Sequence, residues 1–80
     1  MRIKLKFFAS IRELVGSSGE EIDIPEGTTV SSFLDEVRVN HGPLRHMERI
    51  LVAVNGEYVE PDVLLKKGDV VALFPPVSGG

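Results

Sequence analysis

The sequence contains no cysteine. This absence excludes disulfide bonds, thiolate metal ligands and a cysteine nucleophile. No apolar run approaches the about 20 residues that a transmembrane helix requires. The N-terminal stretch MRIKLKFFAS alternates basic and apolar residues, and no apolar block of signal-peptide length follows it. We therefore expect a mature protein in the cytoplasm.

Positive charge is also scarce. Nine Lys and Arg residues are outnumbered by twelve Asp and Glu residues, the formal net charge is −3, and the basic residues do not cluster. Binding to the phosphate backbone of a nucleic acid is therefore not expected. A mildly acidic surface suits a basic protein partner, although the charge could also serve only to keep the protein in solution. Eighty residues with 42% apolar and 26% charged side chains are typical of one globular domain.

The N-terminal third predicts a strand and a short helix. Apolar and basic residues alternate in RIKLKFF at 2–8, as in a strand with one buried face, and Phe8 leaves an aromatic ring on the outer face. In SIREL, Ser10 and Glu13 have the spacing of a capping box, in which the two side chains satisfy free amides at a helix start. Gly16 is expected to end this short helix.

One longer helix is predicted from TTVSSFLDEVRVNHG at 28–42. Thr28 or Thr29 can cap it, and Gly42 followed by Pro43 is expected to end it. Its apolar face consists of Val30, Phe33, Leu34 and Val37, which recur at helical spacing.

The remaining segments predict further strands and turns. The apolar segments 50–54 and 70–74 are expected to be strands covered, at least in part, on both faces. The other expected elements are a strand at 20–24, an irregular connection or helical turn at 44–49, a hairpin turn at Asn55-Gly56, a short strand at 57–59, and a helical turn with a loop closed at Gly68 over 61–69.

This order of elements predicts an α+β fold of the ubiquitin-like β-grasp type. A small mixed β-sheet would have one main helix packed across one face, with the first and last strands parallel and adjacent at its centre. The domain would span residues 1–74, and residues 75–80 would form an extended C-terminal tail ending in Gly-Gly. Apolar residues on the open face of such a sheet would mark a docking surface.

No catalytic or metal-binding set is apparent in the body of the sequence. His41 and His46 lie on either side of Gly42-Pro43, without further ligands at metal-binding spacing, and are expected to be surface imidazoles. The acidic pair Asp35-Glu36 lies on a probable solvated helix face, which offers no burial for a general acid. The serines have no recognisable base, and the glycines form no phosphate loop. An enzyme that acts alone is therefore not expected.

The reactive group is instead the carboxylate of Gly80, at the end of VVALFPPVSGG. A carboxylate is a poor acyl donor until a partner enzyme transfers it to AMP, after which sulfur or an amine can attack its carbon. Gly79 and Gly80 lack a Cβ, so they fit a narrow channel and leave that carbon accessible. Pro75 and Pro76 hold the base of the tail extended, which reduces the entropy lost on insertion. A frayed terminus is the alternative.

Three stretches resemble the small subunit of molybdopterin synthase, the MoaD-like sulfur carriers. They are KFFASIRELVG, VAVNGEYV and, above all, VALFPPVSGG, and the resemblance covers the whole chain. The terminal diglycine is specific to the β-grasp carriers. Within these carriers, the preceding Phe-Pro-Pro is similar to the sequence found in the molybdopterin branch. ThiS-like carriers of the thiamine pathway share the diglycine but are generally shorter and lack this approach.

The resemblance implies a defined route for sulfur. A MoeB-like enzyme would adenylate Gly80 with ATP, and sulfur transfer would then give a thiocarboxylate. The tail would enter a MoaE-like large subunit, where the thiocarboxylate sulfurates the pterin precursor. Two large subunits at the centre and a carrier at each end would form a heterotetramer. The carrier itself would bind no cofactor, since ATP is used by the activating enzyme.

The resemblance also implies roles for individual residues. Gly80 would carry the sulfur, and Gly79 would be the spacer that permits insertion. The residues expected to bind a partner are Phe74, Tyr58, Arg12, Pro75 and Pro76, with Val77 and Phe8 as weaker candidates. Phe74 could instead belong to the core, Tyr58 could be an ordinary cross-strand residue of a hairpin, and Arg12 could be a solvated charge.

Three other functions remain open at this point. Archaeal proteins with the same ending act as modifiers that are joined to lysines through this carboxylate. The chain could also donate sulfur for tRNA thiolation or thiamine synthesis. An adaptor domain with an inert tail is the third possibility.

Overall fold

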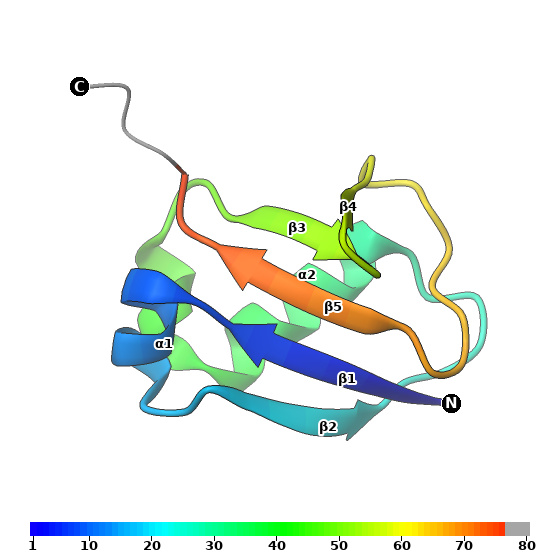
Figure 1. Cartoon of the computed structure of the whole chain (residues 1–80), viewed down its shortest axis with the longest axis horizontal. Coiled ribbons are helices and arrows are strands. Elements are labelled where there is room, and N and C mark those ends of the chain that lie inside the picture. Colours follow the sequence, from blue (N-terminus) through cyan, green and yellow to red (C-terminus); the bar gives the residue numbers. More distant parts are fainter. Residues whose placement is uncertain (77–80) are drawn as a thin grey trace.

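The computed structural model describes residues 1–76, so the predictions for Val77, Gly79 and Gly80 lie outside it. These residues form one five-stranded sheet with helices on one side of it (Figure 1). In chain order the elements are β1 (Arg2–Phe7), α1 (Ala9–Val15), β2 (Gly19–Asp23), α2 (Val30–Asn40), the 3₁₀ helix η1 (Gly42–His46), β3 (Leu51–Val54), β4 (Glu57–Tyr58) and β5 (Val70–Phe74).

The strand order is β2-β1-β5-β3-β4, with β1 and β5 parallel and all other neighbours antiparallel. The first and last strands therefore lie side by side at the centre of the sheet, and α2 lies across one face (Figure 1). This is the α+β, ubiquitin-like β-grasp fold, so the prediction made from element order is confirmed.

The two faces of the sheet differ in burial. In β1, burial alternates strictly, and Ile3, Leu5 and Phe7 are buried beneath the helices. In β5, Val71 and Leu73 are fully buried, whereas the intervening residues are half-buried. The central strand is thus apolar on both faces, as its sequence predicts, but only one face is closed by the protein's own core.

Helix α2 begins where the sequence allows two possible caps. Thr29, not Thr28, is the cap, since its hydroxyl oxygen accepts a hydrogen bond of 3.1 Å from the amide of Ser32. The helix ends at Asn40, earlier than predicted. Pro43 does not end this helix and instead lies in the first turn of η1. Amides in a first turn have no acceptor within the helix, so the missing N–H of proline costs no hydrogen bond there.

The prediction of a capping box at Ser10 and Glu13 is wrong. Helix α1 begins at Ala9 with Phe8 as its N-cap, and no side chain caps it. The carbonyl of Phe8 already accepts the amide of Ile11 at 3.1 Å, and Ile11 is fully buried. Burial of this residue on the core side sets where the helix starts, which leaves Ser10 inside the helix.

The helical turn predicted within 61–69 is also wrong. The chain forms a turn at 61–62 and then runs extended, and Leu64 makes an isolated antiparallel bridge with Thr29. The carbonyl of Val63 accepts the amide of Val30 at 2.9 Å. This amide is one of those that the first turn of α2 cannot satisfy internally, so the extended segment serves as a backbone cap for the helix.

The connection after α2 is held by an arginine that the sequence did not single out. The guanidinium of Arg38 donates to the carbonyls of Leu44 and Met47. Leu44 is fully buried in the core beside α2. Hydrogen bonds from a charged donor are stronger than neutral ones, so Arg38 fixes η1 against the helix.

The hairpin between β3 and β4 confirms its prediction. Asn55 and Gly56 have φ values of 51° and 86°, which only residues tolerant of the left-handed region adopt readily. The Asn55 side chain accepts the amide of Val70 at 2.9 Å and donates to Asp69 at 2.9 Å. The turn is therefore tied to the start of the central strand.

The helix core suggests a direct test of this packing. Phe33→Ala removes a fully buried ring from under the sheet, and we expect a loss of about 3–5 kcal/mol in the free energy of unfolding. Val39→Ala on the same helix, at a side chain that is 73% exposed, should change it by less than about 0.5 kcal/mol. Urea unfolding followed by circular dichroism measures both, and equal losses would contradict the assigned helix face.

Candidate functional site

The sheet face opposite α2, here called the open face, carries a group of apolar residues. Cross-strand partners lie on the same face of a sheet, so the registers identify its members. Phe74 lies opposite Leu51, and Ala53 lies between Ala72 and Tyr58 on the two neighbouring strands. We call this group, with the adjoining Phe8, the aromatic patch: Phe8, Leu51, Ala53, Tyr58, Ala72 and Phe74.

Three rings meet in the aromatic patch. The rings of Phe8 and Phe74 are stacked, with centroids 4.7 Å apart and an interplanar angle of 12°. The ring of Tyr58 is tilted at 59° to that of Phe74, with centroids 6.3 Å apart. Phe8 is 39% exposed and Tyr58 is 68% exposed. Exposed rings around a half-buried centre have the composition of a protein docking surface.

The structure places three of the residues that the sequence analysis predicted to bind a partner. Phe74 is half-buried on the open face and lies outside the closed core. Tyr58 is a cross-strand residue opposite Ala53, and it protrudes from that position. The structure thus brings Phe8, Tyr58 and Phe74 together, although they are far apart in sequence. Their role in partner binding stays a prediction.

Arg12 lies beside this patch, on α1. It lines a depression of about 380 Å³ together with Lys6, Phe8 and the turn before β2. Neither cation forms an ion pair with another residue in the described range 1–76. Two uncompensated positive charges therefore flank Phe8, and they would favour an acidic residue of a partner at this edge.

The far side of the open face is charged and locally neutralised. Arg2 lies opposite Asp23 and contacts it at 3.2 Å, with Glu21 at 3.7 Å. The hydrogen bond from Arg2, followed by its positive charge, lowers the pKa of Asp23. Asp23 therefore stays ionised well into the acid range, and the pair gives this part of the sheet no free charge with which to attract a partner.

The base of the tail leaves from the aromatic patch. Pro75 is half-buried and Pro76 is exposed, and both follow directly on Phe74. The proposed reactive end, Gly79 and Gly80, lies beyond the described residues.

The two histidines do not form a metal site. No group of three or more potential ligands occurs within the described part of the chain. His41 is not the surface imidazole that was predicted, since its side chain is only 21% exposed and its Nε2 lies 2.7 Å from Glu20. Its ring also packs edge-on against Phe7, at 5.3 Å between centroids. His46, by contrast, is exposed in η1.

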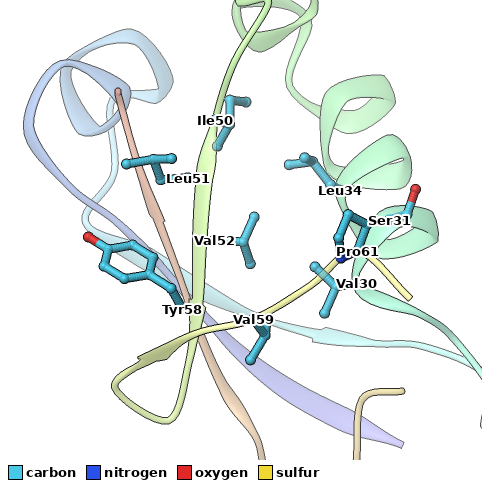
Figure 2. Close-up of a pocket in the computed structure, with 9 residues that line it drawn as sticks. All are labelled: Val30, Ser31, Leu34, Ile50, Leu51, Val52, Tyr58, Val59 and Pro61. Carbon is cyan, nitrogen blue, oxygen red and sulfur yellow. The ribbon is translucent and has the colours of Figure 1, made fainter. Parts of the chain in front are cut away.

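A groove beside β3 was missed by the sequence analysis. It encloses about 540 Å³ and is lined by Val30, Ser31, Leu34, Ile50, Leu51, Val52, Tyr58, Val59 and Pro61 (Figure 2). These residues come from three separate segments, 30–34, 50–52 and 58–61, so no local pattern could have grouped them. Within residues 1–76, no helix is long and apolar enough to cross a membrane.

Comparison with known proteins finds one matching family and similar proteins of about the same length. The ThiS family model matches residues 5–80. The molybdopterin synthase sulfur carrier subunit of Chlamydomonas reinhardtii is 36% identical over 83 residues, which cover all of this chain and all of that protein.

Two solved structures are similar over nearly the same length. A putative molybdopterin converting factor, subunit 1, from Pyrococcus furiosus is 38% identical with a TM-score of 0.89, over 96% of this chain and 99% of that one. SAMP1 from Haloferax volcanii is 32% identical with a TM-score of 0.87, over all of both chains. The aromatic patch and the tail base therefore belong to a framework shared with proteins of both names.

The stacked pair in the aromatic patch can be tested by a double-mutant cycle. For Phe8→Ala, Phe74→Ala and the double variant, we expect a coupling of about 0.5–1.5 kcal/mol in the free energy of unfolding, because the two rings contact each other. Urea unfolding of the four proteins gives this value. Strictly additive losses would show that the rings do not interact in solution.

Proposed function

Since this chain belongs to the ThiS family, we propose that it is a sulfur carrier for molybdenum cofactor biosynthesis and the small subunit of a molybdopterin synthase. The observation that carries this proposal is the full-length identity of 36% to a protein of that name. The sequence adds a Gly79-Gly80 terminus, which supplies the group that such chemistry requires.

The first step is activation of the terminal carboxylate. A carboxylate oxygen of Gly80 attacks the α-phosphorus of ATP in a MoeB-like enzyme, pyrophosphate leaves, and an acyl adenylate forms. Hydrosulfide or an equivalent sulfur donor then attacks the carbonyl carbon. The bond to the phosphate oxygen breaks, AMP leaves with the electron pair, and a thiocarboxylate remains. Two glycines at the end keep this carbon free of side chains that would obstruct attack.

The second step is delivery of the sulfur. The tail enters a MoaE-like large subunit, and the thiocarboxylate sulfur attacks a carbon of the pterin precursor, where a carbon–oxygen bond breaks and the oxygen leaves with its electron pair. Hydrolysis of the resulting thioester releases the carrier with its original carboxylate and leaves the sulfur on the pterin. The large subunit supplies the pocket and basic groups, and two such subunits with a carrier at each end form a heterotetramer. ATP and the sulfur donor are expected in the cytoplasm, which is the location we propose.

The aromatic patch supports this proposal because a tail can be delivered only if the domain that carries it is held by the receiving protein. Exposed Phe8 and Tyr58 flank Phe74, and Pro75-Pro76 continue from that point with restricted backbone freedom. Docking on the patch therefore aims the tail, and stiff prolines reduce the entropy that insertion costs.

A second candidate function is protein modification. The likeness to SAMP1, a small archaeal modifier protein, is 32% identity over both whole chains. Activation at Gly80 would be the same, and the final nucleophile would be a lysine amine in place of a sulfur donor. The two functions can coexist in one chain, because they diverge only after the acyl adenylate.

Removal of Gly80 tests the reactive terminus. The shortened chain should give no molybdopterin with the large subunit, a MoeB-like enzyme, ATP and a sulfur source, since its terminal carboxylate, now on Gly79, would end one residue short of the reacting position. Its urea unfolding midpoint should match that of the full chain, because Gly80 lies outside the core cluster, whose last member is Leu73. Normal product from this variant would refute the proposal.

Mass spectrometry of the intact protein separates the two candidate functions. After reaction with the activating enzyme, ATP and sulfide, a carrier gains the mass difference between one sulfur and one oxygen atom. A modifier in a cell extract is instead recovered as larger species linked to lysines. An unchanged acid after reconstitution, with the activating enzyme proven active on its own substrate, would count against both functions.

The aromatic patch makes a prediction for partner affinity. Phe74→Ala should weaken binding to the large subunit by about 2 kcal/mol or more, or roughly 30-fold, as expected for a central aromatic anchor. Leu14→Ala, at an exposed site on α1 outside the patch, should leave affinity within about twofold. Isothermal titration calorimetry measures both. If Phe74→Ala lowers stability as much as affinity, the ring acts mainly in folding.

A further inference from the structure

The groove beside β3 lies along an incompletely paired edge of the sheet. Strand β4 covers only Ala53 and Val54 of β3, and then the chain leaves the edge at Val59. The groove occupies the space that β4 would have filled had it continued, between this edge and α2 (Figure 2). An edge of this kind can accept a strand from another protein.

The strand register shows which backbone groups face the groove. In antiparallel pairs, successive residues direct their amides and carbonyls alternately toward the two neighbouring strands. The amide of Asn55 donates to β5, at Val70. Leu51 and Ala53 therefore also face β5, whereas Val52 faces the groove. Among the backbone hydrogen bonds outside the strand pairings of residues 1–76, none comes from the Val52 amide.

The side chains that line the groove come from both faces of the sheet. Val52 and Ile50 point toward Leu34 on the helix side, whereas Leu51 and Tyr58 point to the open face (Figure 2). A helix would bury one stripe of side chains in a groove, but a strand presents alternate side chains to both faces. The lining on both sides of β3 therefore matches an extended segment.

The opposite edge of the same sheet provides a contrast. Strand β2 has a free edge too, but it carries Glu20, Glu21 and Asp23, and charged residues of this kind prevent strand addition. The β3 edge has only apolar side chains from Ile50 to Val54. Of the two free edges, only this one is suited to pairing.

The charges around the groove and its position indicate the occupant. Glu57, Glu60 and Asp62 are exposed at the hairpin end, and none forms an ion pair within the described residues. They favour a basic residue at that end of the bound segment. Tyr58 belongs to both the groove and the aromatic patch, so a protein docked on the patch also reaches this edge.

We propose that an extended apolar segment of the large subunit, with Lys or Arg at its hairpin end, pairs with the backbone of β3 at Val52 and packs into this groove. This inference rests on the proposed function, since it takes the protein that receives the tail as the partner. Docking would then have two parts, with rings held on the open face and a strand held at the edge.

A backbone variant tests the pairing directly. Total chemical synthesis can place an N-methyl group on Val52, which removes the outward amide and blocks approach of a strand. The matched control is N-methyl Glu21, because its amide also faces outward, on the β2 edge. We expect calorimetry with the large subunit to show affinity about tenfold weaker or more for N-methyl Val52, and within about twofold for the control. Circular dichroism verifies that both fold.

A side-chain variant and amide exchange give independent readouts. Leu34→Arg places a charge in the groove without touching the open face, and should weaken binding by about tenfold, whereas Val39→Arg on the same helix should not. In the complex, NMR should show slower exchange of the Val52 amide than in the free chain. Unchanged exchange would overturn strand pairing even if affinity fell.

The outcomes separate this inference from the proposed function. If Phe74→Ala weakens binding while N-methyl Val52 and Leu34→Arg bind like the unmodified chain, the partner docks on the patch alone and strand addition is wrong. If the unmodified chain does not bind a large subunit at all, the proposed function fails and takes this inference with it. Weakening by both groove variants, with protection of Val52, supports the paired strand.

Discussion

The parallel pairing of β1 with β5 is the constraint on which the rest of the molecule depends. It places the last strand at the centre of the sheet, so the C-terminal tail leaves from the middle of the domain and not from a frayed edge. Four hydrogen-bonded positions from Lys4 to Phe7 hold the final strand in register. Pro75 and Pro76 therefore continue directly from a central strand that is paired on both sides.

Burial on only one side of this sheet explains how a small domain can both fold and dock. Ile3, Leu5 and Phe7 close the core with α2, and the charged side chains between them keep that half of the open face polar. Beyond β1 this face becomes apolar, since β5 and β4 place Phe74 and Tyr58 on the side where β1 carries lysines. The apolar surface that the core does not bury thus lies in one place, where a partner can cover it.

The fold could be predicted from the sequence because its main signals are periodic and local. Alternation in β1, the helical spacing around Phe33 and the Asn55-Gly56 turn each depend on near neighbours, and all were confirmed. The errors arose where tertiary contacts override local preference. Burial of Ile11 determines where α1 starts, and contacts with the start of α2 hold residues 63–65 in an extended form. The members of the aromatic patch can be identified from the strand register alone. The groove depends on where β4 ends, and no spacing of residues in the sequence predicts that position.

The exposed position of Tyr58 has a practical consequence for work in solution. The chain has no tryptophan and this is its sole tyrosine, so the near-ultraviolet absorption of the free protein comes almost wholly from one ring. That ring protrudes beside Phe74, where the aromatic patch and the groove meet. The molecule therefore contains a built-in chromophore that would report a partner bound at either surface, and it needs no attached label.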